Sequence, residues 1–138
     1  MTSRDVDSAR SRNMRAIRSR DTGPELLLRR GLHARGFRYR VAPRLVVGRP
    51  DLVLPRWRTV VFVHGCFWHA HAGCRFFKLP KTREVFWRDK LEGNVARDER
   101  MLTRLQEEGW RVVVVWECAL RTASEGTIME VEQFLRSE

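Results

Sequence analysis

The amino-acid sequence predicts a single α/β domain in which helices flank a mixed β-sheet. Segments with helical periodicity at residues 22–36, 84–108 and 127–136 alternate with short strand-like segments. Two of those segments, residues 60–63 and 112–116, are uninterrupted apolar runs, which are typical of strands covered on both faces. The chain has 138 residues, of which 43% are hydrophobic, so one domain with a packed core is expected.

The first helix begins at a capping-box pattern, Thr22-Gly-Pro-Glu25, which places a proline near the helix start. Gly36 is a typical residue after a helix end. Strand-like segments follow at residues 37–41, 51–54 and 59–63. The last two are separated by four residues, Pro55 to Arg58, and we expect them to form a hairpin.

The second half of the chain predicts a long helix over residues 84–108, with Gly93-Asn94 as its weak point. A strand over residues 111–117 and an amphipathic helix over residues 127–136 complete the domain. Restriction-endonuclease-like cores have this order of elements, and so do many other α/β folds. Function therefore has to be argued from particular residues.

Positive charge is concentrated near the N-terminus. The net charge is +10, and residues 1–50 hold thirteen arginines, no lysine and only four acids. Residues 1–20 are predicted to form a basic arm that orders on binding, and residues 21–138 the folded domain. Such a distribution favours a polyanionic partner, because cationic side chains release counterions from phosphates. The alternative is a compositional preference for arginine, since 24 arginines stand against three lysines.

No membrane or secretory segment is expected. The N-terminus lacks an apolar core typical of signal peptides, and no run approaches 18 apolar residues. Three cysteines, an odd number, argue against a disulfide framework and leave metal ligands or thiols. A cytoplasmic protein is predicted.

A carboxylate enters the predicted hairpin in the sequence Gly48-Arg-Pro-Asp51. Metal-dependent nucleases of the restriction type place an aspartate there and usually follow it with Glu-x-Lys on the partner strand. Here the corresponding residues are Phe62-Val-His64. If the loop is centred between Arg56 and Trp57, Asp51 lies opposite Phe62 and shares a face with His64. A slip of one residue would separate them.

This register brings Asp51 close to the backbone carbonyl of Val63. A carboxylate and a carbonyl are hard oxygen ligands of the kind that Mg²⁺ prefers. The sequence therefore predicts a magnesium site at the hairpin, although a Pro-Asp pair alone is more often a turn or the start of a strand.

A second cluster combines cysteine and histidine. Cys66, His71 and Cys74 follow the hairpin closely, and Cys118 follows the last strand. Together they form a Cys₃His set, the complement of a closed structural zinc site. His69 is an alternative ligand to His71, because spacing does not separate the two. Buried core thiols are the other explanation.

The histidines that zinc does not use suit phosphodiester chemistry. His64 and His69 can deprotonate water near neutral pH or contact a phosphate. Asp98 falls on the apolar stripe of its helix, so it needs a partner, which an active-site histidine, an arginine or a helix cap would supply. Glu25 is either a helix-capping residue or a further member of the site formed by Asp51 and the histidines. The alternative for each histidine is an ordinary surface residue.

Two pairs of bulky aromatics, Phe67-Trp68 and Phe86-Trp87, lie on polar, basic segments. Apolar wedges of this kind can enter between base steps of a duplex, and peripheral core packing is the alternative. Trp110 and Trp116 flank an apolar strand and are predicted to be core residues.

Together these residues resemble a known family, the very-short-patch DNA mismatch-repair endonucleases (Vsr). The resemblance covers roughly residues 8–121. It rests on the following motifs: Asn13-Met-Arg-Ala-Ile17, Arg20-Asp-Thr22, Gly48-Arg-Pro-Asp51, His64-Gly-Cys-Phe-Trp-His69, Phe86-Trp87, Asn94-Val-x-Arg-Asp98, Gly109-Trp-Arg-Val112 and Val115-Trp-Glu-Cys-Ala-Leu120.

The resemblance implies an enzyme that nicks duplex DNA 5′ of the thymine in T:G mismatches, which arise when 5-methylcytosine deaminates. It implies a restriction-endonuclease-like domain with catalytic Mg²⁺ and structural Zn²⁺. It also implies a bacterial, nucleoid-associated monomer, with mismatch-repair proteins as candidate helpers. Two other readings remain: a nuclease with a different mismatch or sequence target, and a zinc-stabilised DNA-binding module without catalysis, which the missing Glu-x-Lys suggests.

By position, the resemblance assigns a role to each matching residue. Asp51 and the Val63 carbonyl would hold magnesium, and His69 would activate water with support from His64, Glu25 and Asp98. The zinc ligands would be Cys66, His71, Cys74 and Cys118. The DNA contacts would be made by Met14, Arg15, Phe67, Trp68, Trp87, Lys90 and Asn94.

Overall fold

A computed structural model of the chain describes residues 22–41, 48–75 and 77–137. The predicted basic arm, with Met14 and Arg15, lies outside the described residues. The described elements are, in order, α2 (Gly23–Ala34), β1 (Arg40–Val41), β2 (Leu52–Leu54), the 3₁₀ turn η1 (Pro55–Trp57), β3 (Thr59–His64), α3 (Glu84–Glu107), β4 (Arg111–Trp116), α4 (Glu117–Thr122) and α5 (Ser124–Arg136). No helix in these ranges is long and apolar enough to cross a membrane.

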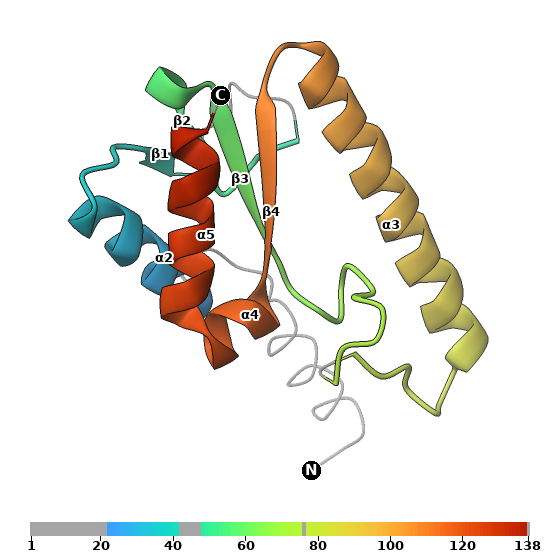
Figure 1. Cartoon of the computed structure of the whole chain (residues 1–138). Helices are drawn as coiled ribbons and strands as arrows, with labels where there is room; N and C mark the ends of the chain where they lie inside the picture. Colours follow the sequence, from blue (N-terminus) through green and yellow to red (C-terminus); the bar gives the residue numbers. More distant parts are fainter. Residues whose placement is uncertain (1–21, 42–47, 76, 138) are drawn as a thin grey trace.

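The strands form one mixed sheet in the order β1-β2-β3-β4. The pairs β1–β2 and β2–β3 are antiparallel, and β3–β4 is parallel. Helices α2, α4 and α5 lie on one side of this sheet and α3 on the other (Figure 1). The mixed α/β architecture predicted from the sequence is therefore confirmed.

The two faces of the sheet carry separate cores because successive strand residues point to opposite faces. Val61 and Val115 belong to the cluster that includes α2, α4 and α5, together with Leu28 and Ile128. The cluster on the other face contains Val60, Phe62 and Leu105 among its buried members. The long helix thus packs on the same face as Phe62, and this placement determines which side chains the site receives.

Three local expectations need correction. Residues 112–116 were expected to be covered on both faces, but only Val115 is buried, because β4 is the edge strand of the described sheet. Gly93-Asn94 does not interrupt α3, which is continuous from Glu84 to Glu107. The short helix α4 was not expected, since residues 117–122 show no long periodicity.

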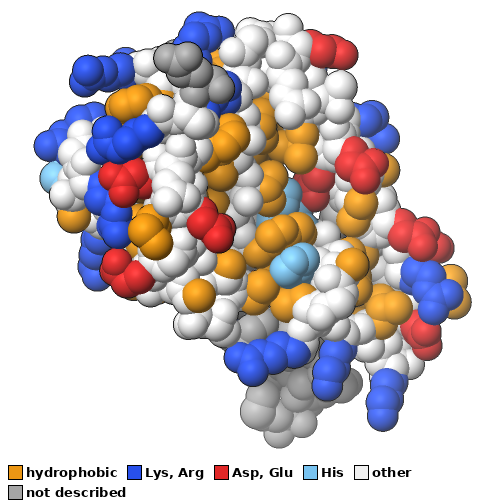
Figure 2. Space-filling view, in the orientation of Figure 1, with side chains coloured by type: hydrophobic (Ala, Val, Ile, Leu, Met, Phe, Trp, Pro, Cys, Tyr) orange, Lys and Arg blue, Asp and Glu red, His pale blue; other side chains and the backbone are white. Residues whose placement is uncertain are grey.

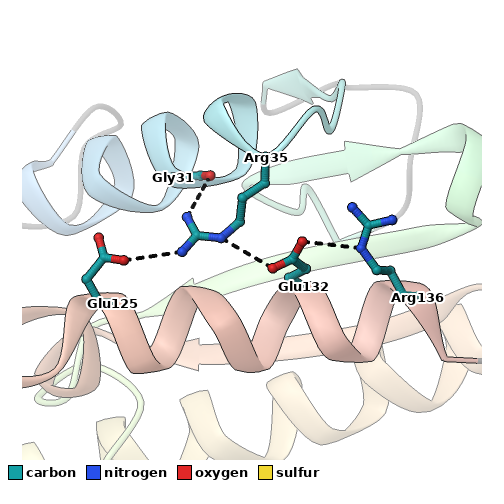
Figure 3. A network of polar contacts seen from close by, with 5 residues as sticks. All are labelled: Gly31, Arg35, Glu125, Glu132 and Arg136. Carbon is teal, nitrogen blue, oxygen red and sulfur yellow. Dashed lines mark hydrogen bonds and ion pairs between the residues drawn. The ribbon is translucent and has the colours of Figure 1, made fainter.

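A polar network joins α2 to α5 (Figure 3). The Arg35 guanidinium donates to the Gly31 carbonyl at 3.0 Å and pairs with Glu125 and Glu132 at 3.2 and 3.4 Å. Glu132 also pairs with Arg136 at 3.2 Å. The helices approach closely at Gly31, where an added Cβ would lie 2.6 Å from the Ile128 side chain. Arg35 therefore ties the end of α2 to the helix packed beside it.

Arg35→Met is expected to lower the free energy of unfolding by about 1 kcal/mol, because a half-buried guanidinium loses both helix-to-helix ion pairs. Urea denaturation followed by circular dichroism measures the change. Arg104→Met is the matched control, since Arg104 pairs with Glu108 within one exposed helix turn. An equal loss of stability in both variants would contradict the role of the network.

Candidate active site and metal centre

The β2–β3 hairpin has the register predicted from the sequence. Leu52 lies opposite Val61 and Leu54 opposite Thr59, so the same register places Asp51 opposite Phe62. The Asp51 amide donates to the Val61 carbonyl at 2.9 Å, and the Val63 amide donates to the Asp51 carboxylate at 2.6 Å. The carboxylate is therefore fixed beside the end of β3.

A cavity of about 320 Å³ opens at this end of the sheet. Its lining brings together residues from α2, the hairpin, the loop after β3 and α3. The five residues predicted to be catalytic all contribute to it: Glu25, Asp51, His64, His69 and Asp98. Figure 2 shows histidine and acidic side chains around a hollow in this face, and lysine and arginine side chains along the lower edge of the molecule.

Asp51 and Glu25 form the acidic wall of the cavity. Burial raises the pKa of Asp51 to about 6; the Val63 amide opposes this rise, nearby Glu25 adds to it, and Arg29 opposes it. Glu25 is only 7% exposed, and its carboxylate lies 3.2 Å from the Arg29 guanidinium. The Glu25 amide also donates to the Thr22 hydroxyl at 3.4 Å, which confirms the predicted helix cap.

This acidic wall fits a divalent cation. The electrostatic cost of burying a carboxylate beside another carboxylate is offset when a cation binds between or next to them. Oxygen donors are also the ligands that Mg²⁺ prefers. Asp51 and the Val63 carbonyl remain the residues that could hold it.

Asp51→Asn is expected to stabilise the protein in magnesium-free, zinc-containing buffer at pH 8, on the order of 2 kcal/mol. The pKa of Asp51 is about 6 in the folded protein against 3.8 ordinarily, so the cost of its charged form grows as pH rises above 3.8 and is complete above about pH 6. Both states are protonated below 3.8, and the difference between variant and wild type should shrink as pH falls. Urea unfolding at pH 8 and pH 5 measures this change. A destabilised variant at pH 8 would contradict the burial argument.

The histidines form a second wall. The His64 and His69 rings stack 3.8 Å apart with an angle of 3° between their planes. His69 Nδ1 lies 2.5 Å from Asp98 Oδ2, so a histidine that lines the cavity is the partner that Asp98 was expected to need. Burial lowers the pKa of His64 to about 4, the neighbouring His69 lowers it further and Asp98 opposes both. When His69 donates its Nδ1–H to the Asp98 carboxylate, Nε2 is left as an acceptor.

Cysteine and histidine donors gather in a separate cluster next to this cavity. The donor atoms of Cys66, His71, Cys74 and Cys118 all lie within 4.8 Å of one another. Cys118 Sγ is 3.5 Å from His71 Nδ1. His69 instead belongs to the group with His64 and Asp98, so the structure assigns His71 to the cysteine cluster.

The donor set fits a tetrahedral metal. Ligands bound about 2.3 Å from zinc lie roughly 3.8 Å apart, which is within the span of these four atoms. Burial raises the pKa of the Cys66 thiol to about 12; a hydrogen bond from the Cys118 backbone opposes this rise, and the Cys118 and Cys74 side chains add to it. A cation would reverse this shift, because thiols that bind metal are deprotonated.

Two residues of this region were missed by the sequence reasoning. Trp116, expected to be core, contacts both clusters: its ring stacks on His71 and meets His64 edge-on. Glu117 lines the active-site cavity and is ion-paired with Arg121. The position of Cys118 could have predicted this. If Cys118 joins Cys66 and Cys74 in one cluster, Trp116 and Glu117 must lie close to the end of β3.

The aromatic residues form a row beside the cavity. Trp87 lies 5.6 Å from Phe67, 6.1 Å from Trp68 and 5.3 Å from Phe86, measured between ring centroids. Trp68 is only 8% exposed, so in this structure it packs at the edge of the core and is not presented as a wedge. Phe67 and Trp87 are half-buried and Phe86 is exposed.

The two residues expected to contact mispaired bases lie on α3. Lys90 is exposed and does not line the cavity, whereas Asn94, one turn further on, does. The Asn94 side-chain amide donates to the Trp68 carbonyl at 3.1 Å. It therefore holds the loop after β3 against α3.

A mixed sheet that presents carboxylates and histidines in one cavity, next to a Cys/His cluster, is the arrangement of an α/β nuclease. Residues 5–75 match the family model described as DNA mismatch endonuclease Vsr. The chain is 53% identical to DNA mismatch endonuclease Vsr of Escherichia coli (strain K12) over 114 residues, covering 83% of this chain and 72% of the relative. The chain therefore belongs to the Vsr family of DNA mismatch endonucleases, as its motifs predicted.

Other relatives are named as nicking enzymes. Identity is 48% with the Type II nicking enzyme V.XorIIP of Xanthomonas oryzae pv. oryzae, over 87% of this chain and 88% of the relative. It is 45% with V.NmeAIP of Neisseria meningitidis, over 88% and 86%. Membership of this family supports DNA as the substrate and strand nicking as the activity.

Proposed function

We propose that this protein nicks duplex DNA 5′ of the thymine in T:G mismatches and so starts very-short-patch repair of deaminated 5-methylcytosine. The observation that carries the proposal is the convergence of Asp51, His64, His69, Asp98 and Glu25 on one cavity. The names of the relatives, mismatch endonuclease and nicking enzyme, support both the substrate class and the single-strand cut.

In this proposal His69 is the general base. Its Nε2 takes a proton from the attacking water, while Asp98 holds Nδ1–H at 2.5 Å and stabilises the imidazolium that forms. His64, stacked on His69 and kept neutral by burial, fixes the ring plane and faces the phosphate.

Asp51 and the Val63 carbonyl would hold Mg²⁺, and Glu25 would support that site. When bound, magnesium supplies Lewis-acid stabilisation of the charge that develops on the phosphate oxygens. The Val63 amide orients the Asp51 carboxylate through the 2.6 Å hydrogen bond, and Arg29 holds the Glu25 carboxylate in place through its ion pair.

DNA recognition would use both sides of the cavity. Phe67 and Trp87 are half-buried and would need less movement to enter a base step than the buried Trp68, which requires an outward movement of the loop that Asn94 now holds. Lys90 and Asn94 would contact the mispaired bases. The arm at residues 1–20, with Met14 and Arg15, would bind the minor groove, and residues 21–138 would form the restriction-endonuclease-like catalytic domain.

The Cys₃His cluster is proposed to hold structural Zn²⁺, which would fix the loop that carries His69. The enzyme is proposed to act as a monomer on DNA in the bacterial nucleoid, with mismatch-repair proteins as helpers. An asymmetric cut in one strand suits a single active site.

A nicking assay tests this proposal directly. A labelled duplex with one T:G mismatch is compared with its T:A counterpart, each with Mg²⁺ and with EDTA. A magnesium-dependent nick 5′ of the mismatched thymine, absent from T:A, is expected. Cleavage at another mismatch would show that the protein is a nuclease with a different target. Tight binding without a nick would favour a zinc-stabilised binding module.

A further inference from the structure

Trp116 occupies a position between the two functional clusters. It is the last residue of β4 and lies opposite His64 in the parallel β3–β4 pair. One face of its ring stacks on His71, with 3.9 Å between centroids and 5° between planes. The ring also meets His64 edge-on, at 5.2 Å and 77°.

These contacts form an unbroken series from one cluster to the other. Asp98 holds His69, whose ring stacks on His64, and His64 abuts Trp116. Trp116 stacks on His71, whose Nδ1 lies 3.5 Å from Cys118 Sγ. Trp116 is the only indole within this series of described residues.

Flat stacking restricts how His71 can rotate, and the edge-on contact limits how far His64 can shift toward β4. A tryptophan side chain has only two torsions, and the backbone of Trp116 is fixed by the pairing of β3 with β4. The same rigid surface therefore sets the plane of a metal-cluster histidine and the position of an active-site histidine.

We propose that Trp116 is a positioning residue that transmits the geometry of the Cys/His cluster to the His64–His69 pair. The inference rests on the proposed function for the roles of those two histidines. The Cys/His cluster would then have two roles: it fixes the loop after β3, and through Trp116 it also positions the proposed base His69.

Trp116→Leu and Trp116→Phe test this inference against Trp110→Leu. Trp110 precedes the other end of β4 and packs against the core cluster of Val60 and Leu105, and it neither lines the cavity nor belongs to the Cys/His cluster. It therefore reports what the loss of an indole does to packing alone. The measurements are kcat and KM on the T:G duplex, and the rate of zinc release from zinc-loaded protein to a chromogenic chelator.

Trp116→Leu is expected to lower kcat by about 50-fold with KM within about twofold, and to release zinc about tenfold faster, since outer contacts of a metal site typically contribute such factors. Trp116→Phe keeps a flat ring, so its kcat and its rate of zinc release should both be close to those of the wild type. Trp110→Leu should leave kcat and zinc release nearly unchanged, even if its melting temperature falls as much as that of Trp116→Leu.

The inference is overturned if Trp116→Leu and Trp110→Leu behave alike, or if the cluster takes up no zinc. A wild-type protein that does not nick DNA would instead refute the proposed function. In that case zinc release alone still decides between positioning and packing, because it does not depend on the reaction.

Discussion

Asp51→Asn is expected to abolish strand nicking while leaving binding to a mismatched duplex intact. Asparagine keeps an oxygen that accepts from the Val63 amide, so the hairpin geometry at 2.6 Å should persist. What is lost is the negative charge next to Glu25 that a divalent cation requires. Several kcal/mol of transition-state stabilisation correspond to a fall in kcat of about 10³-fold.

Single-turnover nicking on the T:G duplex measures this loss, and a gel-shift assay without magnesium measures binding. Asp89→Asn is the matched control, because Asp89 is an exposed acid of α3 that does not line the cavity. Full cleavage by Asp51→Asn would remove Asp51 from the catalytic site. Equal losses in both variants would indicate a general effect of charge on DNA binding.

The same substitution is expected to stabilise the metal-free fold at pH 8, as argued above. A variant that is more stable and nearly inactive would identify Asp51 as a residue kept for function at the expense of stability. Reduced stability together with lost activity would suggest misfolding, so the two measurements need to be made on one preparation.

Local sequence signals predicted the parts of the site that depend on near neighbours. The hairpin register follows from the four-residue loop between β2 and β3, and it places Asp51 correctly relative to Phe62 and Val63. The cap at Thr22 follows from the local motif, and helical periodicity predicted that Asp98 needs a partner without choosing among a histidine, an arginine and a helix cap. Each of these predictions needed only a turn, a cap or a helical repeat.

The remaining features depend on pairing between distant segments. Trp116 reaches His64 because β4 pairs in parallel with β3, and 46 intervening residues hide that register from the sequence. The burial of Trp68 likewise depends on α3 packing beside the loop after β3, where Asn94 holds the Trp68 carbonyl. An aromatic side chain on a polar segment gives no local sign of such a contact.

The choice between His69 and His71 as metal ligand shows this limit most clearly. Both follow Cys66 within a few residues, so spacing leaves the choice open. The backbone decides it: Ala70 adopts a left-handed conformation with φ of 49°, and the His71 amide donates to the Cys66 carbonyl at 2.9 Å. The chain turns back at this point, so His71 faces the cysteines while His69 faces Asp98.

His71→Ala and His69→Ala should therefore fail in opposite ways. His71→Ala removes one of the four proposed metal ligands, and it is expected to lose zinc and several kcal/mol of unfolding free energy, because metal binding is coupled to folding. His69→Ala should keep zinc and stability but lose about 10²–10⁴-fold in kcat, the usual contribution of a general base.

Zinc content per chain, melting temperature and single-turnover nicking separate these outcomes. His33→Ala serves as the control, since His33 is an exposed residue of α2 that belongs to neither described cluster. If His69→Ala lost zinc while His71→Ala retained it, the ligand assignment would reverse, and the stacked His64–His69 pair could no longer supply the base. Retention of zinc and activity by both variants would leave the cysteines as the main ligands and place proton transfer elsewhere in the cavity.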